Sequence, residues 1–333
     1  MKNFTYFRPT SLEAAVALLD ATYGATELLA GGTDLLDLQK EYVAQPDKVV
    51  SLSGLGADFR KITVGTGTPP TVEIGAGATL ADIADHKDLR ELFPGLTTAA
   101  AEIGGPQIRN MGTLGGNLCQ RNRCWYFRDE GVSCLLKGGR KCYATDGDNR
   151  YHAVFTSGHK CVIVNPSTLA PVLIALKAEA EVFGPKGKRT LPLDKFFRAP
   201  ESAEHREHVL AANEIVTKVT LKAGPRNGSY EVRHKQSYDW PLVQAAVAFD
   251  LEGGTARNVR VVLGHVAPTP HIAEAAAKAL EGKRVTEETA VAAGKAATEG
   301  ARPLSGNAYK VKLIEVAVKR AALLAAGAKP YWT

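Results

Sequence analysis

All five cysteines of this 333-residue chain lie in one 43-residue window: Cys119, Cys124, Cys134, Cys142 and Cys161. Thiolates are the soft ligands that zinc and iron–sulfur centres prefer. The window opens directly after a glycine-rich turn at residues 112–117, and glycines let a backbone approach a ligand closely. A thiol-rich segment beside a backbone-exposing loop predicts two cofactors placed close together.

A second glycine loop lies near the start of the chain. Gly31 and Gly32 follow the apolar run 28–30 and precede residues 35–40, which have helical character. N–H groups that enter a helix form an anion cradle suited to a pyrophosphate. A double glycine alone is a weak signal, but with the 109–117 loop it predicts a dinucleotide held between two loops. The segment 75–80 lacks the third glycine of a nicotinamide fingerprint and is interpreted as a strand end.

The elements that must position these loops follow from periodicity. A capping box at Thr10–Glu13 predicts a helix over 11–20, and Thr79 caps another helix. Strands are predicted at 48–52, 72–76 and 215–221, with a hairpin over 179–191. After a boundary near residue 224, we predict strands at 230–233, 242–249 and 259–263 and helices at 271–281, 286–299 and 307–325. This second half therefore reads as an antiparallel sheet covered by helices.

Composition narrows the function class. The chain has 41 Lys and Arg against 35 Asp and Glu, a net charge of +6, and the basic residues are scattered, which predicts no nucleic-acid partner. No run approaches the roughly 20 apolar residues of a membrane span, and Met1 to Tyr6 does not resemble a leader. We expect a cytoplasmic protein with no membrane partner, although export on a signal-bearing partner would need no leader here.

Five motifs together carry a family resemblance. They are residues 28–36, 108–117, 166–171, 235–237 and 264–270. In this order the chain resembles the FAD-binding medium subunit of the xanthine dehydrogenase and carbon monoxide dehydrogenase (molybdenum hydroxylase) family. The resemblance spans nearly the whole chain.

The resemblance implies an α+β protein: a two-subdomain FAD-binding fold of the vanillyl-alcohol oxidase type, followed by a C-terminal domain of antiparallel sheet plus helices. The FAD-binding domain would cover 1–224, with subdomains of about 1–55 and 56–224, and the C-terminal domain 225–333. Residues Ala30 to Asp34 would bind the pyrophosphate, and Lys235 would approach the isoalloxazine. The full implied FAD-binding set is Leu29, Ala30, Gly31, Gly32, Thr33, Asp34, Leu35, Asn110, Thr113, Gly116, Asn117, Thr168 and Lys235.

One position departs from the family pattern. The family usually has an aspartate where this chain has Thr168, and that acid is expected to hold the ribose hydroxyls. A threonine hydroxyl can still form a hydrogen bond, but without the charge assistance of a carboxylate. How this chain would anchor the ribose is thus an open question.

The other departure is an insertion of about residues 118–161. In simple members the glycine loop reaches the next motif within roughly a dozen residues, by resemblance, whereas 49 residues separate Asn117 from Ser167 here. The inserted segment resembles the iron–sulfur insertion of the beta subunit of 4-hydroxybenzoyl-CoA reductase and of some molybdenum aldehyde oxidoreductases. It implies a [4Fe-4S] cluster held by Cys124, Cys134, Cys142 and Cys161, with Cys119 supernumerary.

Spacing alone does not decide between metals. The intervals of nine, seven and eighteen residues fit neither a ferredoxin nor a zinc ribbon, so structural zinc and plain buried thiols stay open as alternatives. The aromatic residues Trp125 and Tyr126 are interpreted as excluding water from the site. His205 and His208 are interpreted as part of a solvated helix face, and His265 is given no catalytic role.

The hypothesis is an electron-transfer flavoprotein subunit with no catalytic residue of its own for an organic substrate. It would carry FAD and a [4Fe-4S] cluster and relay electrons between partners and an external donor or acceptor, a ferredoxin among them. The implied partners are a molybdopterin-containing large subunit and a [2Fe-2S] small subunit. The alternatives are a self-sufficient FAD-dependent reductase of the same flavin fold and a zinc-stabilised binding module.

Overall fold

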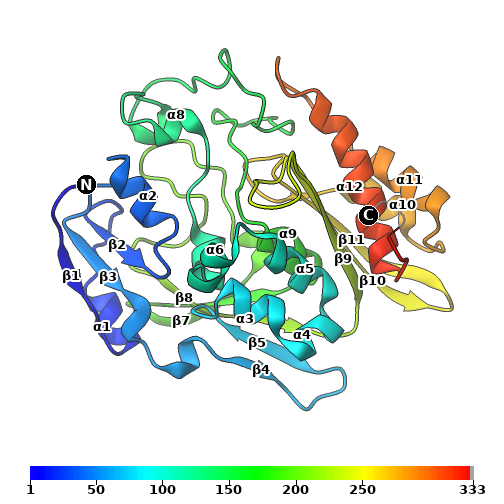
Figure 1. Cartoon of the computed structure of the whole chain (residues 1–333), viewed down its shortest axis with the longest axis horizontal. Helices are drawn as coiled ribbons and strands as arrows, with labels where there is room; N and C mark the ends of the chain where they lie inside the picture. The colour runs from blue at the N-terminus through cyan, green and yellow to red at the C-terminus, as the bar shows by residue number, and fades with distance from the viewer. Residues whose placement is uncertain (331–333) are drawn as a thin grey trace.

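The strands of this computed structural model form three sheets, and the structure describes residues 1–330 (Figure 1). The last three residues of the expected C-terminal domain lie outside this range. The first sheet is parallel with strand order β1-β3-β2, the second has five strands in the order β4-β5-β8-β6-β7, and the third has four in the order β12-β11-β10-β9. The predicted α+β class is confirmed.

The three-stranded sheet carries the first glycine loop. Apolar residues of α1 pack against it, with Ala15 fully buried beside Val50. The predicted capping box is wrong by one residue, because the Ser11 side chain accepts from Ala14 N at 3.2 Å and the helix starts at Leu12. The elements are β1 (Thr5–Phe7), α1 (Leu12–Ala17), β2 (Thr26–Leu29), α2 (Leu35–Lys40), β3 (Lys48–Ser51) and the 3₁₀ turns η1 (Leu52–Gly54) and η2 (Ala57–Phe59).

The five-stranded antiparallel sheet packs its apolar face against short helices. Ile74 and Val219, partners across β5 and β8, are fully buried in this core. The predicted hairpin over 179–191 is present, and Thr79 forms the predicted cap, a capping box with Asp82. The elements are β4 (Ile62–Val64), β5 (Thr71–Gly75), α3 (Leu80–Asp85), α4 (Lys87–Leu92), α5 (Pro94–Glu102), α6 (Pro106–Met111), α7 (Leu114–Cys119), α9 (Leu169–Ala175), β6 (Glu179–Gly184), β7 (Gly187–Pro192), η4 (Leu193–Lys195) and β8 (Ile215–Lys222).

The C-terminal sheet is antiparallel and has helices packed on it, as predicted. Alanines of α12 interlock with the sheet; Ala321 and Ala322 are fully buried. Gly228 of β9 touches α12 so closely that a Cβ there would meet Ala325 N at 2.6 Å. The elements are β9 (Arg226–Val232), β10 (Val243–Glu252), β11 (Thr255–Gly264), β12 (His271–Ile272), α10 (Glu274–Leu280), α11 (Glu287–Ala296) and α12 (Tyr309–Ala325).

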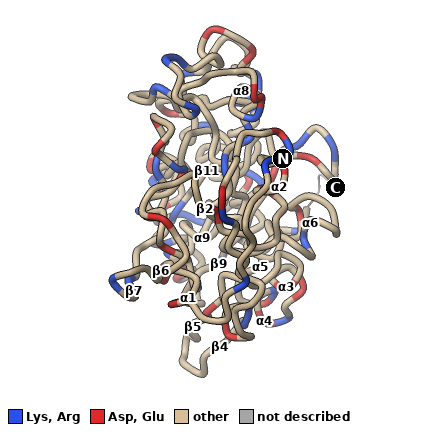
Figure 2. The backbone as a smooth tube through the Cα atoms, turned by 90° about the vertical axis from the view of Figure 1, so that its left-hand side faces the viewer, with Lys and Arg blue, Asp and Glu red and all other residues tan. Residues whose placement is uncertain are grey.

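The segment between α7 and α9 has little regular structure. It contains α8 (Trp125–Arg128) and one 3₁₀ turn, η3 (Leu135–Lys137), and it forms the loops at the top of Figure 1. Basic and acidic residues are interspersed along it in Figure 2. We call residues 120–161 the insert. Within residues 1–330, no helix has the length and apolar character needed to cross a membrane.

Candidate functional site

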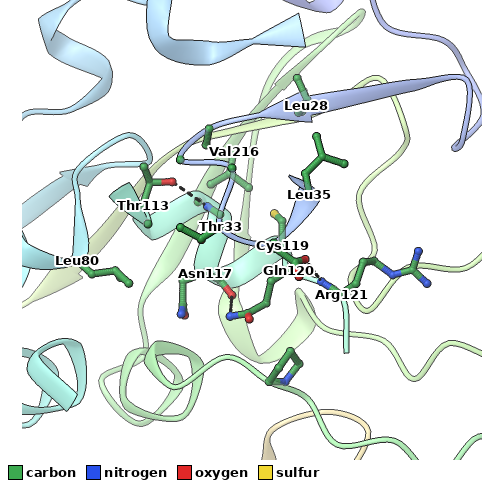
Figure 3. Close-up of a pocket in the computed structure, with 18 of the residues that line it drawn as sticks. Leu28, Thr33, Leu35, Leu80, Thr113, Asn117, Cys119, Gln120, Arg121 and Val216 are labelled. Atoms are coloured by element: carbon green, nitrogen blue, oxygen red, sulfur yellow. Dashed lines mark hydrogen bonds between the residues drawn. The ribbon is translucent and has the colours of Figure 1, made fainter. Parts of the chain in front are cut away.

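A cavity of about 460 Å³ lies where the two glycine loops meet, and we call it the large cavity. Its walls come from the first sheet, from the five-stranded sheet and its helices, and from the turn after β9. Figure 3 shows Thr33, Thr113 and Asn117 lying close together on its lining, with Leu28 and Leu35 on one side and Leu80 on the other. The two loops that the sequence singled out therefore form one site.

Glycine is required where the loops touch. A Cβ on Gly31 would lie 1.8 Å from the Met111 carbonyl oxygen, so no side chain fits there without moving the backbone. Gly32 has φ +76°, a left-handed conformation that L side chains rarely adopt. The second loop enters α7 through Thr113, whose hydroxyl accepts from Gly116 N at 3.1 Å. The result is a narrow cradle lined by backbone.

A buried polar corner ties α7 to the turn before α9. Asn117 Oδ1 accepts a hydrogen bond from the Ser167 hydroxyl at 2.7 Å. The Thr168 carbonyl accepts from Gln244 Nε2 at 2.8 Å, and its hydroxyl lies 3.4 Å from His265 Nε2. Burial lowers the pKa of His265 to about 3, so this imidazole is neutral. The corner presents hydroxyl and amide groups, but no cation, to the cavity.

Most of the implied FAD-binding residues line the large cavity: Ala30, Gly31, Gly32, Thr33, Asp34, Leu35, Thr113, Gly116, Asn117 and Thr168. Three do not line it. Leu29 lies behind the loop, with its Cδ1 facing Gly32, and Asn110 uses its side-chain amide on the Pro106 carbonyl at 2.9 Å. Lys235 lies on the exposed turn after β9, whose Tyr238 and Trp240 do line the cavity.

Four cysteines converge on a second, small cavity. Cys124, Cys134, Cys142 and Cys161 all line it, together with rings and aliphatic side chains that include Tyr126, Phe127, Leu136, Tyr143 and Ile163. All five cysteines of the chain are free thiols. The four predicted ligands thus lie together in an apolar setting, and Cys119 lies apart from them on the wall of the large cavity.

The thiols of the small cavity influence one another. The Cys161 thiol hydrogen-bonds Cys142 and lowers the pKa of Cys142 to about 5, whereas burial raises the pKa of Cys124 to about 12. His152 Nε2 lies 3.1 Å from Cys124 Sγ. In residues 1–330, no three His, Cys, Asp or Glu side chains gather closely enough to hold a single metal ion.

The walls of the two cavities are connected. Arg123 lines the large cavity and its sequence neighbour Cys124 lines the small one. Leu38 of α2 lines the large cavity and also packs in one apolar cluster with Cys134 and Cys161. Asp34, at the end of the first glycine loop, accepts from Arg121 N at 2.8 Å. The walls of the two cavities are therefore linked by direct packing and by neighbouring residues in the chain.

The prediction for residues 205–208 is wrong. This segment is not helical, and Arg206, Glu207 and His208 are buried. Burial opposes ionisation of Glu207, but Arg121 and the Asn122 hydrogen bonds lower its pKa below the usual range, and Arg121 Nε lies 2.7 Å from its Oε2. Asn122, which hydrogen-bonds Glu207, comes from the insert and lies 85 residues away in the chain, so no local pattern indicates that Glu207 is buried.

Sequence reasoning also missed two acids on the wall of the large cavity, Glu102 at the end of α5 and Glu231 on β9. Both face Arg233, at 3.7 Å and 3.8 Å respectively. The one available signal concerned Glu231, which is a single acid in its strand. The preceding strand residues Asn227, Gly228 and Ser229 are small and buried.

Family models match almost the whole chain. Residues 2–221 match the model described as FAD binding domain in molybdopterin dehydrogenase. Residues 228–325 match the model described as CO dehydrogenase flavoprotein C-terminal domain.

Curated relatives and solved structures agree with these matches. The chain is 34% identical to the aldehyde oxidoreductase FAD-binding subunit PaoB of Escherichia coli (strain K12), over 94% of this chain and 95% of the relative. It is 30% identical to the carbon monoxide dehydrogenase medium chain of Hydrogenophaga pseudoflava, over 96% of each. A solved structure of carbon monoxide dehydrogenase from the same organism superposes with a TM-score of 0.74 at 29% identity, covering 98% of both chains.

Proposed function

Because the chain belongs to the family of FAD-binding subunits of molybdopterin dehydrogenases, we propose that it is an electron-transfer subunit carrying both FAD and a [4Fe-4S] cluster. Family membership makes it the flavoprotein component of an oxidoreductase. The cluster and the relay are the further step. The observation that carries this step is the gathering of four cysteines in a small cavity, two of which, Cys134 and Cys161, pack in one apolar cluster with Leu38 of the large cavity.

The large cavity fits FAD. Its first loop leads into the start of α2, where the backbone N–H groups of a helix suit a pyrophosphate, and Gly31 lets the second loop pack directly against it. Asn117, Thr113 and Thr168 would line the rest of the nucleotide. When bound, FAD exchanges one or two electrons and an iron–sulfur cluster exchanges one at a time. This chain would bind the flavin, orient it and exclude water.

The donor set of the small cavity fits an iron–sulfur cluster better than zinc. Four sulfurs bound to one zinc would each lie about 2.3 Å from a single point, and no such gathering exists among the described residues. A cubane spreads its four thiolates over four irons, so its ligands stand farther apart. The apolar lining, with Phe127 and Leu136, would keep solvent from the cluster.

We propose a molybdopterin-containing large subunit and a [2Fe-2S] small subunit as partners, with a ferredoxin or another carrier as external donor or acceptor. The match along the whole length of dehydrogenase subunits supports a subunit over a self-sufficient reductase. PaoB, at 34% identity, is named for an aldehyde oxidoreductase, which favours aldehyde oxidation, with electrons leaving the complex through this chain.

The test compares Cys142→Ser with Cys119→Ser in anaerobically purified protein. The wild type should contain about four irons and four sulfides per chain and show flavin bands on a broad visible shoulder. Cys142→Ser should lose the shoulder, the iron and the paramagnetic signal of the reduced cluster while retaining FAD. Cys119→Ser, a control that lies in the large cavity, should retain iron.

Two results would contradict this proposal. If the wild type is colourless and contains zinc, the protein does not carry the proposed cluster. Equal loss of iron in both variants would contradict the assignment of the cluster ligands. Absence of FAD from folded wild type would overturn the flavin site.

A further inference from the structure

Glu231 holds an unpartnered carboxyl oxygen at the wall of the large cavity. Its side chain is 1% exposed, and Oε1 has no hydrogen-bond partner. Oε2 lies 3.8 Å from Arg233 Nη1, too far for a hydrogen bond. A buried carboxyl oxygen without a hydrogen bond destabilises the folded protein unless another group supplies that hydrogen bond.

The neighbouring side chains do not supply the missing hydrogen bond to Glu231. Arg233 donates Nη1 to the Glu102 carbonyl at 2.9 Å and faces both acids at ion-pair distance. The buried carboxyl of Glu231 and the partly exposed carboxyl of Glu102 thus share one guanidinium, and among residues 1–330 no group hydrogen-bonds Glu102 Oε2 either. Burial first, and then the charge of Glu102, raise the pKa of Glu231 well above its usual value. A protonated Glu231 offers an O–H donor as well as an acceptor.

The position of Glu231 places this carboxyl at the polar corner. It is paired across the sheet with Gln244, whose amide donates to the Thr168 carbonyl. Thr168 and Glu231 both line the large cavity here. Through Ser167, the same turn is bonded to Asn117 of the second glycine loop. Glu231 and Thr168 are therefore held at the same corner of the cavity through Gln244.

We infer that Glu231 is a binding residue for the flavin nucleotide: beside Thr168, its carboxyl forms hydrogen bonds with a hydroxyl or imide group of bound FAD. This inference rests on the proposed FAD site. The neutral acid matches such groups because each of them both donates and accepts. A negatively charged ligand group, such as a phosphate, would bind poorly at this position, because Glu102 already places negative charge nearby.

The experiment measures binding of FAD, riboflavin and ADP to the deflavinated full chain by fluorescence titration. Glu231→Leu should weaken FAD binding about tenfold or more, because the FAD group that Glu231 binds would lose its hydrogen bonds in a buried site. Glu231→Gln, which donates and accepts like the neutral acid, should bind FAD within about threefold of wild type. Glu181→Gln, an acid on β6 paired with Thr217 and away from the cavity, controls for the change of residue type.

The ligand fragments identify the part of FAD involved. A loss with riboflavin but not with ADP places the contact on the flavin half, and the reverse places it on the adenosine ribose; either supports the inference. Wild-type affinity for FAD in both Glu231→Leu and Glu231→Gln would overturn it. So would a loss in Glu231→Gln as large as in Glu231→Leu, because that result would require an ionised acid.

A second measurement applies if Glu231→Leu does not fold. Wild-type FAD affinity should fall as the pH rises through the ionisation of Glu231, whereas the affinity of Glu231→Gln should stay level. The groups that face this carboxyl are Glu102 at the end of α5, Arg233 just after β9 and Thr168 before α9. Parallel pH profiles for the two proteins would overturn the inference. Failure of folded wild type to bind FAD would instead overturn the proposed function.

Discussion

The large cavity and the insert are built in different ways. Around the large cavity, sheets and helices with continuous apolar cores bring two glycine loops into backbone contact, as at Gly31 and Met111. The insert has one four-residue helix and one 3₁₀ turn, and polar side chains tie it to the rest of the molecule. One site is specified by backbone conformation and the other by partners distant in sequence.

The ties of the insert lie at both of its ends. At its start, Glu207 accepts from the Asn122 backbone at 3.0 Å and side chain at 2.7 Å, and Asp34 accepts from Arg128. Near its end, the buried Lys310 of α12 donates to carbonyls of the insert. Single substitutions can therefore test the two modes of construction separately.

The largest effect is expected from Gly31→Ala. Its methyl group would overlap the Met111 carbonyl oxygen, so the two loops must separate, at a cost of about 3 kcal/mol. FAD content should fall to near zero, while any iron bound by the insert is lost to a smaller degree. Flavin absorbance and denaturant unfolding measure the two effects.

Gly56→Ala is the matched control. Gly56 has φ −59°, and no atom lies within 4 Å of a Cβ built there. This change should leave FAD bound and should slightly raise stability by restricting the unfolded chain. Equal flavin content in the two variants would mean that the contact between the glycine loops does not hold the cofactor.

The next effect is expected from Lys310→Met. Lys310 Nζ donates to the carbonyls of Tyr151 and His152, each at 3.1 Å, and of His265 at 2.8 Å. Removing it takes a donor from each of these carbonyls, of which His152 retains Asn307, and should lower the free energy of unfolding by about 3 kcal/mol. Because two of the carbonyls belong to the insert, hydrogen exchange there should rise more than in the five-stranded sheet.

Lys312→Met, on the same helix, provides the comparison. The Lys312 side chain is exposed and pairs only with Glu315 of its own helix, so its loss should change stability by less than about 0.5 kcal/mol. Similar unfolding curves for both lysine variants would show that Lys310 is not an anchor of the insert.

The sequence predicted most of the frame because its signals are local. Alternating apolar residues marked β8 and the hairpin β6–β7, and the alanine-rich runs marked α10 to α12. Boundaries were less accurate where a neighbour decides them, as at Ser11, which caps α1 in place of Thr10. Glycines predicted the cradle because a loop without side chains is itself a local signal.

The sequence did not predict groups whose burial depends on distant partners. Glu207 looked solvated because Arg121 and Asn122, which neutralise and hydrogen-bond it, come from the insert. Glu231 lies on β9 and Glu102 at the end of α5, and the two acids come together at Arg233. Lys235 was expected at the cavity from its motif, but the turn that carries it directs Tyr238 and Trp240 there instead.

The smallest effect is expected from Asp34→Asn, which alters the contact between the two sites. Asp34 accepts from the Arg121 backbone at 2.8 Å and Arg128 Nη2 at 2.5 Å, and it lies 3.0 Å from Arg123 Nη1. The amide keeps one acceptor but loses the charge, so a loss of about 1 to 2 kcal/mol is expected for these partly buried groups. Trypsin should then cleave the arginine-rich start of the insert faster, while apolar packing holds the large cavity together.

Asp37→Asn separates this effect from a general loss of charge. Asp37 also accepts from Arg128, at 2.6 Å, but its side chain is half-exposed, so solvent replaces the contact at little cost. Faster cleavage in Asp34→Asn alone would locate the link between the cavities at the end of the first glycine loop. Equal cleavage in the two variants would mean that the insert is held by Glu207 and Lys310 without help from that loop, and the two modes of construction would then be independent.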